Sequence, residues 1–206
     1  LELFDATPGA VLIGTQMIAK GLDFPDVTLV GVINADTMLK LPDFRAAERT
    51  FDLLEQVAGR AGRGEKPGKV IIQSYWSTHP AIASVVTHDR RPFLDTELKE
   101  RKEGTYPPFS RLSNVLFWGA SEKEVRRVAD QMAEALHTKL DAQTGWEILG
   151  PADCVKAKVK DKYRRHILVK APVDAQVGEI LSECAASLDK RVGINMTLDV
   201  DAYDMM

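Results

Sequence analysis

The sequence is poor in cysteine and contains no long apolar run. Only Cys154 and Cys184 occur among its 206 residues. Two cysteines cannot form a four-ligand zinc site, and we expect no disulfide framework. Both are expected to be small buried side chains in a reducing compartment. Because no apolar run reaches membrane-spanning length and no signal peptide is visible, we expect a cytoplasmic protein without a membrane partner.

An excess of positive charge is lacking as well. The chain has 27 Lys and Arg against 30 Asp and Glu, a net charge of -3. Any binding to nucleic acid must therefore come from local patches. A G-x-x-x-x-G-K-[ST] phosphate loop does not occur in the sequence. We therefore do not expect this chain to supply the phosphate-binding loop of a nucleotide site. The length allows one large or two small domains.

The most informative stretch covers residues 43–64, DFRAAERTFDLLEQVAGRAGRG. Its apolar residues repeat at helical spacing, which predicts a core-facing helix. In such a helix Gln56, Arg60 and Arg63 are four and three residues apart, so they share one face. Two guanidiniums on one face suit a phosphoryl group. The alternative is a solvated basic face near a helix C-terminus.

Similarity to known sequence motifs extends this pattern. Residues 56–63, QVAGRAGR, resemble motif VI of superfamily-2 helicases, and residues 14–25, GTQMIAKGLDFP, resemble motif V. With VTLVGVINAD, LPDFRAAERTF and YPPFSRL, nearly the whole chain resembles the PriA family of replication-restart helicases, most densely over residues 11–64. A DExH-type acidic motif is absent. The resemblance therefore implies the C-terminal part of a longer helicase.

The resemblance also implies roles for individual residues. Arg63 is the first choice for an arginine finger, which stabilises transition-state charge. Thr15 as a helix N-cap and Asp23 as a turn carboxylate are the ordinary alternatives. By resemblance, the catalytic residues are Arg63, Arg60 and Gln56, the nucleotide contacts are Gly21, Asp23, Arg60 and Arg63, and the DNA contacts include Thr15 and Gln16.

The activity implied by the resemblance is ATP-driven unwinding of DNA with 3′ to 5′ polarity, during primosome assembly at stalled forks. It implies ATP and Mg²⁺ as cofactors, and zinc bound by a family insertion whose ligands are not in this chain; we expect no metal ligands here. Expected partners are forked, branched or single-stranded DNA, single-stranded DNA-binding protein and primosome proteins. The chain alone is expected to be inactive. The rival hypothesis is a DNA- and protein-binding scaffold without motor activity, although the motif residues match the active pattern.

The first part of the chain predicts an α/β lobe. Apolar runs at residues 10–13 and 27–33 favour buried strands. Residues 69–75 predict another strand after the helix. This strand, helix, strand order is typical of a RecA-like lobe with a mainly parallel sheet, which we place at residues 1–78. Two short helices, broken at Arg91-Pro92, predict a linker over residues 79–105.

Tyr106-Pro107-Pro108-Phe109 marks a boundary, because two prolines cannot continue a helix. Beyond it, the pattern is βαββαβ, which predicts a small ferredoxin-like α+β domain over residues 106–206. Ser121 with Glu124 forms a capping box for the first helix, and Asp174 is expected to cap the second. Strands are expected at residues 112–118, 147–149, 154–159, 164–170 and 194–200.

A cationic hairpin is predicted within this domain. Lys156, Lys158 and Lys160 alternate with Val155, Ala157 and Val159, which predicts one cationic and one apolar face. Lys162, Arg164, Arg165 and Lys170 add to this patch, which suits backbone phosphates without base readout. The alternative is a solubilising, lysine-guarded edge. Tyr163 either stacks on a base or packs against the sheet. The DNA contacts expected here are Lys156, Lys158, Lys160 and Arg164.

Overall fold

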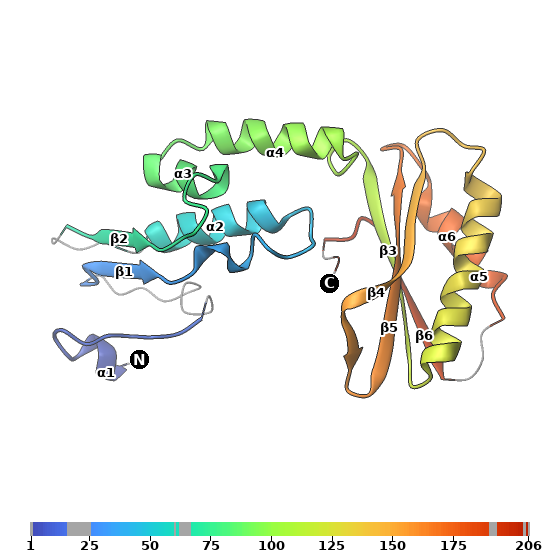
Figure 1. Ribbon diagram of the computed structural model, residues 1–206, viewed down its shortest axis with the longest axis horizontal. Helices are drawn as coiled ribbons and strands as arrows, with labels where there is room; N and C mark the ends of the chain where they lie inside the picture. The colour runs from blue at the N-terminus through green and yellow to red at the C-terminus, as the bar shows by residue number, and fades with distance from the viewer. Residues whose placement is uncertain are drawn as a thin grey trace. The chain divides into compact units, whose positions relative to one another are not determined.

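The computed structural model describes residues 2–15, 26–59, 61, 67–189, 193–203 and 205. The chain divides into two compact units, Leu1–Leu98 and Lys99–Met206 (Figure 1). In the described ranges, no helix combines the length and the apolar character needed to cross a membrane. Cys154 and Cys184 are both buried, as expected.

A pair of parallel strands forms the sheet of the first unit. Strand β1 (Leu29–Val32) pairs with β2 (Lys69–Ile72), with Leu29 opposite Lys69. Helix α2 (Ala46–Ala58) lies between them in sequence. The strand predicted at residues 27–33 and its parallel pairing are therefore present, but the predicted burial of this strand is wrong. Leu29 is 57% exposed, because the side chains of β1 alternate between exposed and half-buried positions.

The strand predicted at residues 10–13 is also absent. This segment follows helix α1 (Glu2–Asp5) without regular structure, and Val11 and Ile13 are more than four-fifths exposed (82% and 87%). A strand needs a hydrogen-bonded neighbour, and in the described residues β1 pairs with β2 alone. An apolar run of this length therefore does not specify a strand without a partner.

The core of the first unit joins α2 to the two helices that follow β2. Phe51 and Leu54 of α2 are buried together with side chains from α3 (Pro80–Thr87) and α4 (Arg91–Glu103). The rings of Phe51 and Phe93 stack with centroids 4.5 Å apart. A short 3₁₀ turn, η1 (Ala35–Thr37), contributes Ala35. The segment expected as a linker therefore supplies part of this core.

The break between α3 and α4 lies earlier than predicted. His88 ends α3 in the left-handed region with φ of 55°. Pro92 belongs to the first turn of α4, where its missing N–H costs no helical hydrogen bond. The two predicted helices are therefore present, and the break between them lies at residues 88–90, directly before Arg91-Pro92.

The second unit has the predicted element order. Its strands and helices are β3 (Arg111–Gly119), α5 (Glu122–Leu140), β4 (Glu147–Val159), β5 (Lys162–Ala171), α6 (Val177–Ala186) and β6 (Ile194–Asp199). The strands form one antiparallel sheet in the order β4-β5-β3-β6. Figure 1 shows α5 and α6 on the same side of this sheet, so neither helix of this unit covers the other face.

Side chains of the strands point alternately to the two faces of the sheet, and those on one face form a core with these helices. Val115 and Phe117 of β3 and Ile167 of β5 are fully buried with the apolar stripe of α5. Burying each such side chain contributes about 1.5–3 kcal/mol. The residues between them, such as Leu116 and Trp118, therefore point to the face without helices.

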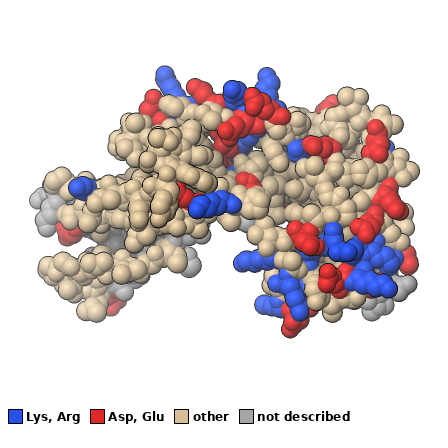
Figure 2. Space-filling model, viewed as in Figure 1, with Lys and Arg blue, Asp and Glu red and all other residues tan. Residues whose placement is uncertain are grey.

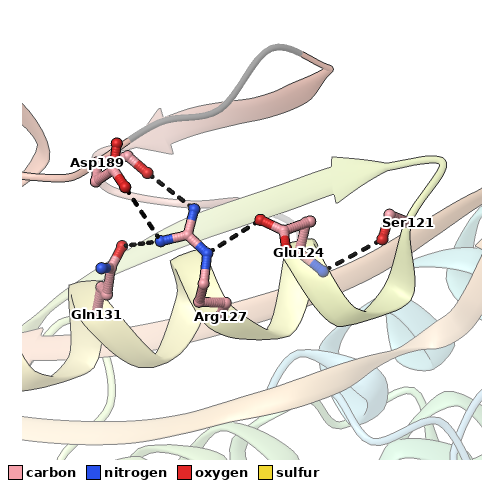
Figure 3. A network of polar contacts seen from close by, with 5 residues as sticks. All are labelled: Ser121, Glu124, Arg127, Gln131 and Asp189. Carbon is pink, nitrogen blue, oxygen red and sulfur yellow. Dashed lines mark hydrogen bonds and ion pairs between the residues drawn. The ribbon is translucent and has the colours of Figure 1, made fainter.

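Polar contacts fix the ends of both helices (Figure 3). The Ser121 hydroxyl accepts the Glu124 backbone N–H at 3.4 Å, the cap predicted for α5. The guanidinium of Arg127 donates to Glu124 Oε2, Gln131 Oε1 and the backbone oxygen of Asp189, each at 3.0 Å. Asp189 follows α6, so Arg127 joins the two helices. The cap predicted at Asp174 is wrong, because the N-cap of α6 is Gln176.

Candidate nucleic-acid interface

Only some of the motif residues lie in the described part of the chain. Gln16, Gly21, Asp23, Arg60 and Arg63 lie outside the described residues. Thr15 is exposed and belongs to no helix or strand. Gln56 is exposed in the last turn of α2, and its side chain is open to a ligand. The shared face of Gln56, Arg60 and Arg63 stays a prediction.

A buried carboxylate ties together the carboxyl ends of the two parallel strands. Asp36, just after β1, is fully buried and accepts hydrogen bonds from the Ser74 hydroxyl at 2.6 Å and the Tyr75 N–H at 2.8 Å. The Trp76 N–H donates at 3.2 Å. These donors, led by Ser74, lower the pKa of Asp36. They also draw the chain away from the sheet, so β2 ends at Ile72 instead of extending to residue 75.

Two aromatic side chains are exposed at this strand end. Tyr75 is 83% exposed and Trp76 is 47% exposed. The Lys40 ammonium lies 5.6 Å from the Trp76 ring centroid. Ligands of open α/β sheets gather at the carboxyl ends of the strands, so these rings are available to a ligand. Asp36, shortly after the strand predicted at residues 27–33, was the sequence feature that could have indicated this site. No role was predicted for it.

The β4–β5 hairpin differs from its prediction. Its turn is Lys160-Asp161, whose φ angles of 47° and 59° fit a two-residue type I′ turn. The pairing shifts register between Asp153 and Lys158, which interrupts the side-chain alternation. The expected common face of Lys156, Lys158 and Lys160 is therefore wrong, and so is the expected apolar face. Val155 is 51% exposed, and Val159 is 36% exposed.

Several basic side chains of the predicted patch have structural partners instead. Lys158 Nζ lies 3.2 Å from Asp161 Oδ1, which raises the pKa of Lys158, and 5.0 Å from the Tyr163 ring. Tyr163 itself packs against the core, the second of the two roles considered for it. Arg165 lies 3.6 Å from Asp153. These contacts leave less of the patch free for DNA than predicted.

Lys170, another basic residue of the predicted patch, also makes structural contacts. It is buried, with Nζ 2.8 Å from Glu147 Oε2 and donating to the Gly104 carbonyl at 2.8 Å. Its ammonium also lies 4.2 Å from the centre of the Tyr106 ring. Lys170 therefore joins the end of β5 to the chain that follows α4.

The remaining basic residues surround a hollow on the helix-free face of the sheet. The hollow has a volume of about 280 Å³ and is lined by Leu116, Trp118, Val159, Lys160, Lys162 and Arg164. Figure 2 shows Lys and Arg side chains gathered around this end of the second unit. Apolar side chains and cations thus line one depression, which we call the basic hollow.

Strand pairing explains why these residues meet. Trp118 of β3 lies opposite Arg164 of β5, and Val159 lies opposite Lys162 across the hairpin. Within the described ranges, no carboxylate lies within ion-pair distance of Lys160, Lys162 or Arg164. Burial and the nearby Arg164 charge lower the pKa of His166, which disfavours a further positive charge beside the hollow. The hollow is therefore cationic and suited to an anionic ligand.

Comparison with known proteins assigns both parts of the chain. The family model of the primosomal protein N C-terminal domain matches residues 102–203, and that of the helicase conserved C-terminal domain matches residues 1–65. The chain is 42% identical over 212 residues to "Replication restart protein PriA" of Bacillus subtilis, which covers 100% of this chain. The protein of the same name from Treponema pallidum is 42% identical over 208 residues and also covers 100% of this chain. The chain belongs to the PriA family.

The PriA relatives are much longer than this chain. It spans 26% of the Bacillus protein and 31% of the Treponema protein. The helicase match contains β1, η1 and α2, together with the motif residues predicted from the sequence. The basic hollow lies within the match to the PriA C-terminal domain. Both candidate interfaces therefore belong to regions shared with PriA proteins.

Proposed function

We propose that this chain is part of an ATP-dependent DNA helicase of superfamily 2, which unwinds with 3′ to 5′ polarity during replication restart. The full-length likeness to PriA proteins supports the helicase and replication part of this proposal. The observation that carries the DNA contact is the basic hollow, which is lined by three cations that have no ionic partner among the described residues. Phosphate anions are the natural ligands of such a site.

The motor chemistry is assigned to the first unit. Arg63 acts as arginine finger, Arg60 contacts the γ-phosphate and Gln56 senses nucleotide, while Gly21 and Asp23 approach ATP. Of these, Gln56 is the one within the described ranges, and its exposed position at the end of α2 is compatible with this role. A guanidinium near the γ-phosphate stabilises charge that develops during transfer. We also assign the β1–β2 pair to a RecA-like lobe.

Cofactor binding is shared with other parts of the protein in this proposal. ATP with Mg²⁺ supplies the free energy for unwinding. In the ranges that the structure describes, no three His, Cys, Asp or Glu side chains gather to hold a metal ion. The proposal assigns the Mg²⁺ ligands and the zinc ligands to parts of the longer PriA protein that this chain does not include.

DNA contacts are assigned to both units. Thr15 and Gln16 touch the strand on the motor side, and Lys160, Lys162 and Arg164 hold phosphates on the other unit, whose βαββαβ order we assign to the ferredoxin-like group. Lys156 remains a candidate, while Lys158 is already paired with Asp161. The DNA is a fork or another branched substrate, and single-stranded DNA-binding protein and primosome proteins are the proposed partners.

Unwinding by the full-length protein tests this proposal. The substrates are labelled forks that carry either a 3′ or a 5′ single-stranded tail, with and without ATP. We expect ATP-dependent displacement on the 3′-tailed fork and little on the 5′-tailed fork. A protein that binds both forks but hydrolyses no ATP would contradict the motor role and favour the scaffold hypothesis.

A further inference from the structure

We propose that the basic hollow binds one unpaired base of a DNA strand, stacked on Trp118, while Lys160, Lys162 and Arg164 hold the neighbouring phosphates. This inference rests on the proposed function, since it takes DNA as the ligand. It goes further by assigning an unpaired nucleotide to one site, with Trp118 as the stacking partner in place of Tyr163, the ring considered from the sequence.

The floor of the hollow is the first reason. Leu116, Trp118 and Val159 present apolar side chains within a depression of about 280 Å³. Because α5 and α6 of this unit pack on the opposite face, neither of them covers this floor. A base offers a flat apolar face that matches an indole ring, and stacking of this kind tolerates any sequence. A base therefore covers apolar surface that is otherwise left to water.

The position of the cations is the second reason. Arg164 lies directly opposite Trp118 in the β3–β5 pairing, and both side chains line the hollow. Lys162 is two residues away on the same face of β5, about 6.7 Å along the strand. Lys160 approaches from the hairpin turn and lines the same hollow. Cations on the rim and a ring on the floor suit a nucleotide, which joins an anionic phosphate to an aromatic base.

Other anionic ligands match this arrangement less well. In a duplex the bases are stacked inside. The phosphates of a duplex can therefore pair with the cations, but its bases cannot cover the Trp118 ring. An acidic peptide likewise satisfies the cations, but a carboxylate has no flat face for the indole. The combination of Trp118 with the three cations therefore favours an unpaired nucleotide over both alternatives.

Variants of Trp118 in the 206-residue chain give the first test. The probes are a fluorescent oligothymidylate of about 12 nucleotides and a duplex of equal length, measured by anisotropy at one salt concentration. We expect Trp118→Leu to weaken single-strand binding by roughly 5- to 150-fold and duplex binding by less than about twofold. Trp118→Phe keeps a ring and should retain most of the single-strand affinity. Phe109→Ala removes another exposed aromatic ring and serves as the matched control.

An abasic oligonucleotide gives the second test, independent of any change in the protein. It has the same phosphates but no bases. The parent chain should bind it about as weakly as Trp118→Leu binds the oligothymidylate. The triple variant Lys160→Gln, Lys162→Gln, Arg164→Gln should weaken binding to every probe. Lys123→Gln on the opposite helical layer should leave binding unchanged.

The outcomes separate the inference from the proposed function. If the parent binds the abasic strand and the oligothymidylate equally well, the hollow holds phosphates alone and the inference is wrong, while the proposed DNA contact stands. If no probe binds, the inference and the proposed DNA contact of the hollow both fail, while the unwinding assay tests the motor role separately. If an Asp-rich peptide binds in a Trp118-dependent way while DNA does not, the hollow belongs to a protein partner, and the inference and the DNA contact again fail. Thermal melts check that each variant folds, and the abasic test needs no variant.

Discussion

At the scale of single residues, the environment decides whether a charged side chain makes structural contacts or stays available to a ligand. Lys170 and Arg164 belong to the same strand and both were predicted to add to one basic patch. Lys170 is buried between Glu147 and the Gly104 carbonyl, whereas Arg164 faces the basic hollow. Asp36 is similarly enclosed by donors from the chain after β2.

Asp36→Asn tests the structural role of this carboxylate. The amide keeps the shape but loses the charge that strengthens the hydrogen bonds to Ser74 and Tyr75. We expect a lower urea midpoint for the variant at neutral pH. Because the folded pKa of Asp36 is lowered, the parent's advantage should be complete above the ordinary Asp pKa and lost as pH falls through the lowered value. A difference that does not change with pH would contradict this assignment.

Arg63→Ala tests the arginine finger in the full-length protein. Removal of the guanidinium should lower kcat for DNA-stimulated ATP hydrolysis by about 10³-fold or more, because the developing charge loses its partner. Affinity for DNA should stay near normal. Steady-state ATPase assays with Arg91→Ala, an exposed arginine of α4, as control provide the measurement. A decrease in kcat of less than about tenfold would contradict the assignment of Arg63 as arginine finger.

At the scale of elements, register determines which side chains act together. Strict alternation along 155–160 predicted one lysine face, but the shift between Asp153 and Lys158 and the turn at Lys160-Asp161 separate those lysines. The features of helix α5 were predicted correctly. Its apolar stripe and its Ser121 cap follow from local spacing, and both are present.

The salt dependence of DNA binding tests the new grouping. Each lost phosphate contact should reduce the slope of log K against log salt by about 0.7 to 0.9. Replacement of Lys160, Lys162 and Arg164 with Gln should therefore flatten the slope by roughly two units or more. The matched set Lys156, Lys158 and Lys160 should change it less, because Lys158 is paired with Asp161. Equal effects of the two sets would argue against the grouping in the structure.

Arg127→Ala tests the connection between α5 and the segment after α6. The variant loses the hydrogen bonds to Glu124, Gln131 and the Asp189 backbone (Figure 3). We expect the second unit to lose about 1–2 kcal/mol in its free energy of unfolding. Arg126→Ala, the exposed neighbour on the same helix, should change it by less than about 0.5 kcal/mol. Urea melts monitored by circular dichroism compare the two, and equal losses would show that Arg127 makes no special connection.

At the scale of the whole molecule, the chain combines a motor-related unit with a separate α+β unit. The division falls at Leu98 and Lys99, and the helicase and PriA C-terminal matches lie on either side of it. Each unit has its own core, so each candidate interface is built within one unit. The motor role nevertheless requires groups that the chain does not contain in sequence, such as a phosphate loop.

The isolated 206-residue chain should therefore not hydrolyse ATP, with or without DNA. The phosphate loop and the acidic Mg²⁺ motif of a helicase are absent from its sequence, and an arginine face alone does not activate water. A coupled ATPase assay on the purified chain, with the full-length protein as positive control, provides the measurement. DNA-stimulated turnover by the chain alone would contradict the proposed division of the ATP site.

The sequence by itself determined the PriA family membership, the βαββαβ order and the buried stripe of α5, because motif wording and periodicity are local properties. It also pointed to the motif residues and the hairpin as candidate sites. Only the tertiary structure decided which cations are free, that Trp118 lies beside Arg164, and that Asp36 holds the chain after β2. These depend on strand pairing, a register shift and hydrogen bonds between segments far apart in the chain. Each such contact depends on where the backbone places both partners, and a local pattern contains no information about that.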